Sequence, residues 1–169
     1  VFERAGRYDV TLWVANRDQD YAIASVTVTV EDPQTAYAGA RTICHSNSGN
    51  FSGCPSGAQQ FTSAVAAIAA ANQDRMRVLF RAGEVTRFEA NTAFSGLRDI
   101  QIGPFGAGPK PILRIDASIS KNLFEPRGTD GFTIFGLEMR GDYDPRTGLG
   151  ENFDEGGFRN SGPVFNTTI

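Results

Sequence analysis

The chain has 169 residues, a formal net charge of −3 from 16 Lys and Arg against 19 Asp and Glu, and 40% hydrophobic residues. This length allows one medium domain or two small ones, and the hydrophobic fraction is enough to bury a core. The sequence contains no block of like charge, which argues against a nucleic-acid-binding protein, and no apolar run approaches the roughly 20 residues that cross a bilayer.

The first 30 residues predict an antiparallel hairpin. In residues 8–14 (YDVTLWV) and 23–30 (IASVTVTV), apolar side chains largely alternate with polar ones. The polar segment 16–20 (NRDQD) separates the two runs as a turn. Alternation with a period of two is typical of half-buried strands. A lone hairpin is only marginally stable in water. We therefore expect further strands, either from upstream sequence or from a neighbouring molecule.

This hairpin resembles the C-terminal part of a PKD domain, an immunoglobulin-like sandwich common in secreted bacterial enzymes. The match covers residues 1–32 and departs from the family at residues 18–20, where a glycine of the turn is usual. The residues that carry it are Gly6, Tyr8, Val10, Leu12, Val14 and Asn16, followed by the strand Val26–Val30 and by Glu31, Asp32 and Pro33. The resemblance implies that residues 1–32 are the last strands of a β-sandwich. Residues 33–41 (PQTAYAGAR) then predict a short linker, because proline and small residues favour irregular chain.

Two cysteines, Cys44 and Cys54, enclose nine polar and glycine-rich residues. A disulfide closing such a loop would stabilise the fold by roughly 2–3 kcal/mol and would imply an oxidising compartment. The alternative is a pair of free thiols in a cytosolic protein. A metal site would need more ligands than His45, the single histidine, which we expect to be a polar loop residue.

The segment after the cysteines predicts a helix over about 57–72. Ser56 and Gln59 have the spacing of a capping box, and the alanine-rich run that follows strongly favours helix. Phe61, Val65 and Ile68 give it one narrow apolar face.

Short apolar segments then follow in series, broken by glycine or proline. They lie at 75–81, 97–103, 111–117, 132–141 and 163–169. Short strands joined by loops of uneven length are typical of a β-solenoid or a sandwich. The sequence therefore predicts a mainly β protein.

The order of these segments resembles the start of a pectate-lyase-like right-handed parallel β-helix. The match covers residues 42–169 and rests on the cysteine loop, the helix, the segment 103–111 (GPFGAGPKP) and the rung-like segment 136–141 (GLEMRG). Phe105 stands where tyrosine is commoner in the glycine-rich turn of that family. The resemblance implies that the helix caps the open end of the coil, whose first rung would otherwise expose unpaired backbone and an apolar interior. Since both modules look incomplete on their outer sides, we expect the full gene product to be longer.

Acidic residues near the end of the chain are candidates for a calcium site. Glu138, Arg140 and Asp142 share one face of a predicted strand, and the acidic loop that follows includes Asp144 and Asp154. The resemblance implies calcium held by Asp142, Asp144 and Asp154, since calcium prefers several hard oxygen ligands. In a lyase it would neutralise a uronate carboxylate while a Lys or Arg removed the proton. The alternative is a solvated, glycine-rich surface loop. The sequence does not identify the catalytic residues of such an enzyme.

Arginines supply the other candidates. Arg75, Arg77 and Arg81, with Arg87 and Arg98 nearby, would make a basic strip for an acidic glycan, because guanidinium groups pair well with carboxylates and sulfates. Glu138 and Arg140 complete the candidate substrate-binding set. Ordinary outward positions on an edge strand explain the strip equally well, since charge there discourages edge pairing.

The sequence therefore predicts a segment of a secreted, extracellular or cell-surface protein, with the periplasm as another location, that interacts with polysaccharide. The first hypothesis is a lyase or hydrolase of acidic polysaccharide. The alternative is a non-catalytic adhesin, fibre or surface structural protein, whose sandwich edge would be completed by a strand from another chain. A simple sugar-binding module is the third.

Overall fold

The computed structural model describes residues 5–17, 20–88, 92–115 and 123–140, and it is mainly β. The chain divides into two compact units, Val1–Ala36 and Tyr37–Ile169, which are described separately below. No helix in the described part of the chain is long and apolar enough to cross a membrane.

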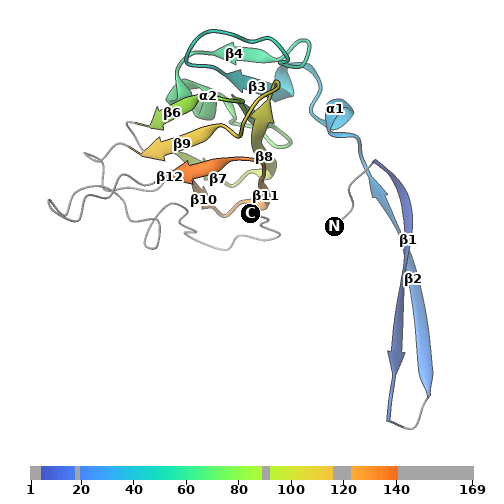
Figure 1. The fold of residues 1–169 in the computed structure, drawn as a ribbon. Coiled ribbons are helices and arrows are strands. Elements are labelled where there is room, and N and C mark those ends of the chain that lie inside the picture. Colours follow the sequence, from blue (N-terminus) through green and yellow to red (C-terminus); the bar gives the residue numbers. More distant parts are fainter. Residues whose placement is uncertain (1–4, 18–19, 89–91, 116–122, 141–169) are drawn as a thin grey trace, which may run out of the picture. The chain divides into compact units, whose positions relative to one another are not determined.

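The first unit is the predicted hairpin (Figure 1). Strand β1 (Gly6–Ala15) pairs with β2 (Tyr21–Val30) in antiparallel register, from Gly6 opposite Val30 to Ala15 opposite Tyr21. The turn between them is closed by Asn16, whose backbone N–H donates to the Asp20 carbonyl at 3.0 Å and whose Oδ1 accepts from the Asp20 N–H at 3.0 Å. One helical turn, α1 (Pro33–Ala36), follows. The hairpin prediction is thus confirmed.

The two sides of the hairpin differ in chemistry. We call one the apolar side; it carries Tyr8, Val10, Leu12 and Val14 of β1 opposite Val28, Val26, Ala24 and Ala22 of β2. Leu12 is 61% exposed and Val26 60% exposed. On the other side, Thr11 and Ser25 share a hydrogen bond of 3.0 Å, and the Thr27 hydroxyl donates to Asp9 at 2.7 Å. Trp13 and Ile23, 68% and 49% exposed, also lie on this second side. Large apolar side chains exposed on a sheet are typical of a surface that another element covers.

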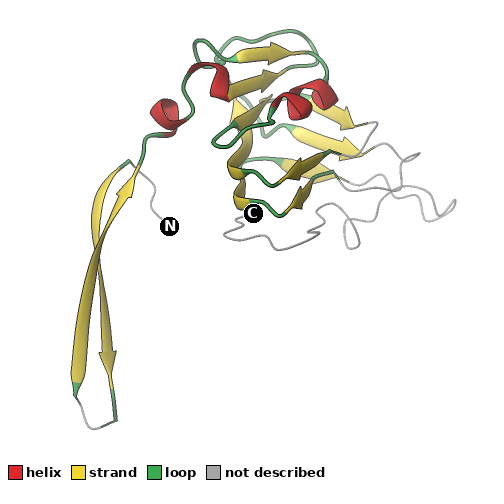
Figure 2. Ribbon diagram, turned by 180° about the vertical axis from the view of Figure 1, so that it is seen from behind, coloured by secondary structure: helices red, strands yellow, loops and turns green. Residues whose placement is uncertain are grey.

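The described strands of the second unit form three parallel sheets (Figure 2). The largest has the strand order β11 (Asp130–Ile134), β8 (Arg98–Phe105), β5 (Arg77–Arg81), β3 (Thr42–His45) and β4 (Gln59–Phe61). The second has the order β12 (Glu138–Arg140), β9 (Ile112–Ile115) and β6 (Val85–Phe88), and the third pairs β10 (Glu125–Arg127) with β7 (Ala93–Ser95). Consecutive strands visit the three sheets in turn: β5, β6 and β7, then β8, β9 and β10.

A row of aromatic rings fills the interior of this unit. His45 contacts Phe80 with 5.4 Å between ring centroids, Phe80 contacts Phe88 at 5.9 Å, and Phe88 contacts Phe124 at 6.0 Å. The row continues through Phe94 to Phe132, and all six rings are fully or almost fully buried. Tilted and edge-on ring pairs contribute about 0.5–1.5 kcal/mol each beyond the burial of their area.

The helix is shorter than the predicted range of about 57–72. Helix α2 spans Ala64–Ala70, and its N-cap is Ser63, whose Oγ accepts from the Ala66 N–H at 3.3 Å, rather than Ser56. Residues 59–61 instead form β4, because their backbone pairs with β3 and the sheet satisfies the hydrogen bonds that a helix would have supplied. The buried face of α2 is Ala64, Ala67 and Ile68.

The predicted linker 33–41 is more ordered than expected. It contains α1 and a 3₁₀ turn, η1 (Gly39–Arg41), and between them Tyr37 is 6% exposed. The Tyr37 hydroxyl donates to the Asp99 carbonyl at 3.3 Å, and its ring lies 5.7 Å from the Arg77 guanidinium. The aromatic residue thus anchors the second half of the predicted linker to the second unit.

The predicted disulfide between Cys44 and Cys54 is confirmed. Cys44 lies in β3 and packs against Leu79 and Phe105, together with Phe51 and Ala58. This small apolar cluster is separate from the aromatic interior. The segment that follows Cys44 is therefore tied to the sheet both covalently and by apolar contact.

Candidate anion-binding surface

An in-register row of arginines crosses the second sheet. Arg87 of β6 lies opposite Arg114 of β9, and Arg114 lies opposite Arg140 of β12. Figure 1 shows these three strands stacked one beside the next. Neighbouring strands lie about 4.8 Å apart. Three guanidinium side chains therefore start from successive strands in one line, which we call the arginine ladder.

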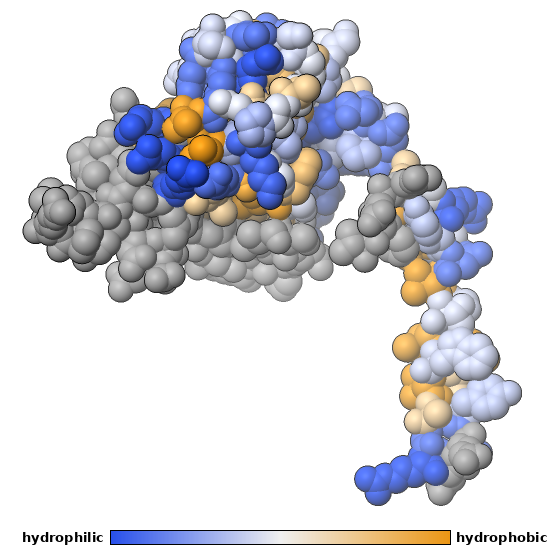
Figure 3. Space-filling view, in the orientation of Figure 1, coloured by the Kyte–Doolittle hydropathy of each residue, from blue (hydrophilic) through white to orange (hydrophobic). Residues whose placement is uncertain are grey.

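Side-chain alternation directs the ladder outward. In β6, Thr86 and Phe88 are buried, whereas Val85 and Arg87 are exposed. In β9, Leu113 is buried and Arg114 is half-buried. A second outward row runs beside the ladder through Val85, Ile112 and Glu138. Figure 3 shows hydrophobic and hydrophilic residues side by side over this part of the molecule.

The ladder gives this face an excess of positive charge. The described strands β6, β9 and β12 contain three arginines and one carboxylate, Glu138. Glu138 accepts from Arg140 Nε at 2.6 Å, and both side chains are about half exposed. An exposed ion pair of this kind is weak, with a typical contribution of about 0–1 kcal/mol. Guanidinium groups bind carboxylates and sulfates in a bidentate manner, so the ladder is chemically suited to an acidic ligand.

The structure does not place Arg75, Arg77 and Arg81 in one exposed strip, as the sequence predicted. Arg77 is only 4% exposed, and its Nε donates to Thr42 Oγ1 at 2.6 Å. Arg81 donates to the Ser52 carbonyl at 2.8 Å and lies 5.9 Å from the ring centroid of Phe105. Arg75 precedes β5 with a positive φ of 59°. Arg77 and Arg81 thus join segments of the protein, and their strand is not an edge strand, because β5 lies between β3 and β8.

The remaining predicted residues divide into two groups. Glu138 and Arg140 lie together on β12, and Arg140 belongs to the ladder. Asp142, Asp144 and Asp154, the proposed calcium ligands, lie outside the described residues. Within the described ranges, no three or more His, Cys, Asp or Glu side chains cluster closely enough to hold a metal ion. The calcium site stays a prediction.

His45 is not the polar loop residue that we expected. It ends β3 and is fully buried next to Phe80, with Nδ1 3.4 Å from Thr86 Oγ1. Its Nε2 has no hydrogen-bond partner among the described residues. Burial lowers the pKa of His45, and the Thr62 carbonyl and the Glu84 carboxylate only partly oppose that effect. The buried imidazole is therefore favoured in its neutral form.

Glu84 fixes the start of the cysteine loop. Its carboxylate accepts from the hydroxyls of Ser46 and Ser48 and, at 2.7 Å, from the Asn47 N–H. Burial acts to raise the pKa of Glu84, but these hydrogen bonds to the ionised form outweigh it and lower the pKa. The Asn47 amide also donates to the Val85 carbonyl at 2.7 Å. The loop is thus held against the first residue of β6.

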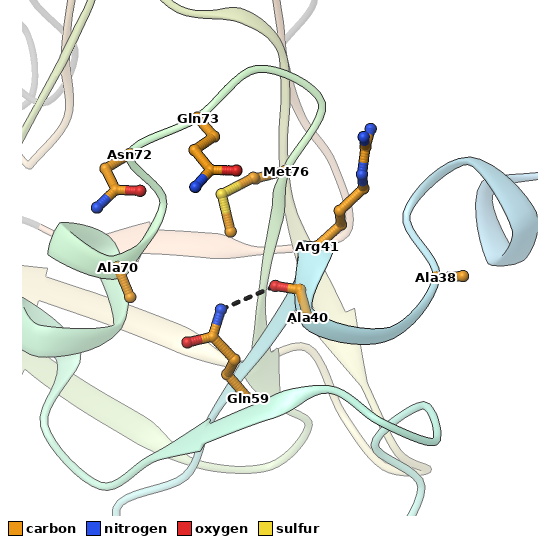
Figure 4. A pocket seen from close by; sticks show the side chains of 8 residues that line it. All are labelled: Ala38, Ala40, Arg41, Gln59, Ala70, Asn72, Gln73 and Met76. Atoms are coloured by element: carbon orange, nitrogen blue, oxygen red, sulfur yellow. Dashed lines mark hydrogen bonds between the residues drawn. The ribbon is translucent and has the colours of Figure 1, made fainter.

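A cavity of about 540 Å³ lies beside the helix, at its C-terminal end (Figure 4). It is lined by Ala38, Ala40, Arg41, Gln59, Ala70, Asn72, Gln73 and Met76. Gln59 Nε2 donates to the Ala40 carbonyl at 2.8 Å, a bond drawn in the figure. Three of its four polar side chains are amides and the fourth is a guanidinium, so its chemistry suits uncharged or anionic groups. It does not include any residue of the ladder.

No protein-family model, curated protein or solved structure matches this chain. Function is therefore inferred from the residues themselves. The ladder as a whole was missed at the sequence level, although it left a signal there. Arg114 lies 27 residues after Arg87 and 26 before Arg140, and each arginine follows an inward-facing residue of its strand. A search for internal repeats at that period would have aligned them.

Proposed function

We propose that this protein binds an acidic polysaccharide outside the cell through the arginine ladder. The observation that carries the proposal is the register that places Arg87, Arg114 and Arg140 in one outward line. A charged polymer presents repeated anionic groups, and a row of cations at a regular spacing is complementary to such a ligand. Val85 and Ile112 lie beside the ladder and offer an apolar strip for the less polar faces of sugar rings.

The proposed architecture is the start of a right-handed parallel β-helix. The strands enter three parallel sheets in rotation, and a row of aromatic side chains fills the space between them. Helix α2 would close the first coil by burying Ala64, Ala67 and Ile68. The hairpin would be the last part of a PKD-like sandwich that serves as a spacer. Further coils beyond the described strands would lengthen the ladder surface.

The proposed location is the extracellular space or the cell surface. The Cys44–Cys54 disulfide supports it, because disulfides persist in oxidising compartments and are rare in the cytosol.

Binding to a panel of glycans tests the proposal. We expect measurable affinity for alginate, pectate or a sulfated glycan and none for dextran, with affinity that falls as salt screens the charges. Arg114→Gln should weaken binding at least several-fold. Arg98→Gln, which removes an exposed arginine of β8 outside the ladder, is the matched control. Equal loss in both variants would mean that binding follows net charge rather than the ladder.

The same panel tests for lyase activity. Cleavage by elimination creates an unsaturated uronate, which absorbs in the ultraviolet, so incubation with and without calcium gives a direct readout. Binding without any new absorbance or new reducing ends would leave a binding protein and would contradict the lyase and hydrolase hypotheses.

A structural role, as an adhesin or fibre component, is the second candidate function. It is favoured by the apolar side of the hairpin, where Leu12 and Val26 are largely exposed. A strand or sheet from another chain would bury this surface. Leu12→Lys should then abolish self-association measured by analytical ultracentrifugation, whereas Thr11→Lys on the opposite side should not. A monomer at every concentration would contradict assembly through the hairpin.

A further inference from the structure

The arginine ladder ends at a cavity. Strand β6 is the outermost described strand of its sheet, and a cavity of about 190 Å³ lies beside it. The lining residues are Asn47, Thr62, Ser63, Ala64, Val65 and Arg87. Arg87 therefore belongs both to the ladder and to the cavity.

The walls of this cavity suit a sugar. Asn47 contributes an amide, Thr62 and Ser63 contribute hydroxyls, and Val65 contributes an apolar surface. Asn47 is held in place, since its backbone N–H donates to Glu84 at 2.7 Å and its amide donates to the Val85 carbonyl at 2.7 Å. Among the described lining residues, Arg87 is the one cation and none is a carboxylate. An anionic group in the cavity would thus meet the Arg87 guanidinium.

The protein blocks the ladder beyond this point. Helix α2 contacts β6, and Ala64, which lines the cavity, is itself buried in the core. The Asn47–Val85 hydrogen bond covers the free edge of β6 on the same side. Figure 1 shows α2 and β6 as neighbours at this end of the sheet. A chain that follows the ladder from Arg140 to Arg87 therefore meets a wall rather than an open surface.

We propose that this cavity is a terminal subsite that receives the end residue of an acidic glycan chain. The carboxylate or sulfate of that residue pairs with Arg87, and its hydroxyls exchange hydrogen bonds with Asn47 and Thr62. The acidic groups of the following sugars lie towards Arg114 and Arg140. This inference rests on the proposed function and adds that the protein recognises a chain end rather than an internal stretch.

Stoichiometry against chain length tests the inference. Size-defined oligouronates of increasing length would be titrated into the protein by calorimetry. End recognition predicts one protein per chain at every length, because each chain has one end of the bound kind. Blocking that end, by reductive amination at the reducing terminus or by an added substituent at the other, should weaken binding at least about tenfold.

A variant that fills the cavity provides an independent test. Thr62 is exposed, so Thr62→Tyr should fold while its ring occupies the subsite. We expect it to weaken oligouronate binding at least about tenfold, and Thr62→Ser, which keeps the hydroxyl, to bind normally. If Thr62→Tyr lowers the melting temperature, Val65→Phe gives the same blockage from a second exposed position.

The outcomes separate this inference from the proposed function. A stoichiometry that rises with chain length, combined with weaker binding by Arg114→Gln and normal binding by Thr62→Tyr, would overturn the terminal subsite and leave the ladder as a binding surface. Failure of every acidic glycan to bind would overturn both.

Discussion

Gly53 and Gly106 meet backbone to backbone: a Cβ atom added to Gly53 would lie 2.9 Å from the Cα of Gly106. Gly53 belongs to the loop closed by the disulfide, and Gly106 begins the turn that follows β8. Both have positive φ, +87° and +76°. The glycine-rich segment 103–111 thus has a structural explanation in this chain, because it lets the cysteine loop pack closely on the sheet.

Gly53→Ala should destabilise the protein by about 1–3 kcal/mol, because the methyl group meets backbone that has no rotamer to change. Denaturation by urea would measure the free energy of unfolding. Gly96→Ala is the matched control, since its φ is also positive (+65°) but no atom of the described residues lies within 4 Å of the added Cβ. Equal effects of the two substitutions would show that backbone strain alone is responsible.

Gly103→Ala should lower the free energy of unfolding less than Gly53→Ala does, although the contact that its added Cβ makes is shorter. The added Cβ would lie 2.4 Å from Phe135 Cζ, but that ring is 46% exposed, so we expect it to rotate towards solvent. We expect a loss below about 1 kcal/mol. The same urea denaturation of Gly103→Ala, alone and with Phe135→Ala, checks this. A loss as large as that of Gly53→Ala would mean that the Phe135 ring is fixed.

Removal of the disulfide by Cys44→Ala and Cys54→Ala should lower the free energy of unfolding by about 2–3 kcal/mol from loop entropy. Cys44 is fully buried against Leu79 and Phe105, so its truncation adds a packing loss. Reduction of the wild-type protein separates the two effects, because it opens the loop without removing the sulfur atoms. Hydrogen exchange should quicken in residues 46–58 in both cases.

The hairpin and the disulfide were predicted correctly because both depend on signals that are local in the sequence. The hairpin follows from a period-two pattern that needs no distant partner, and the disulfide from two cysteines across a short polar loop. The helix was overextended because the capping box at Ser56 and the alanine run are local signals, whereas the pairing of β4 with β3 is a tertiary contact. His45 was misjudged for the same reason. Its polar neighbours in sequence indicate a loop, but β3 places it between sheets.

The arginines show the limit of sequence reasoning about the site. Arg75, Arg77 and Arg81 were grouped because they are close in sequence, and the structure buries Arg77. The ladder joins residues from three strands that are 26 or 27 positions apart, and only the register of parallel pairing brings them into line. Parallel strands are joined by long connections, so their pairing is not visible in a local window.

Glu138→Gln should strengthen binding of an acidic glycan several-fold. The Glu138 carboxylate lies 2.6 Å from Arg140 Nε and forms an ion pair with it. Its negative charge also repels an anionic ligand on the same face. The amide keeps the shape and removes the charge. Affinity measured at two salt concentrations would check this, because the gain should shrink as salt screens the charge. Glu31→Gln is the control, because it removes an exposed carboxylate of the first unit instead. It should leave binding unchanged.

The free energy of unfolding should fall as the pH is lowered through a range that is set by the pKa of His45. Burial lowers the folded-state pKa of His45 below that of the unfolded chain, which is about 6.5. Protons therefore bind preferentially to the unfolded state, so this contribution is fully present above about pH 6.5 and is lost as the pH falls through the lower folded-state pKa. His45 is the only histidine, and histidine is the side chain whose ordinary pKa lies between about pH 5 and 8. The pKa of Glu84 is also lowered, and its contribution is lost only at more acidic pH, below the ordinary range of a glutamate. Urea denaturation from pH 7.5 to about 2.5 should show both losses in the wild type, and His45→Leu should remove the first while keeping the second. A wild-type profile that stays flat between pH 6.5 and 5 would mean that the imidazole gains a partner on protonation.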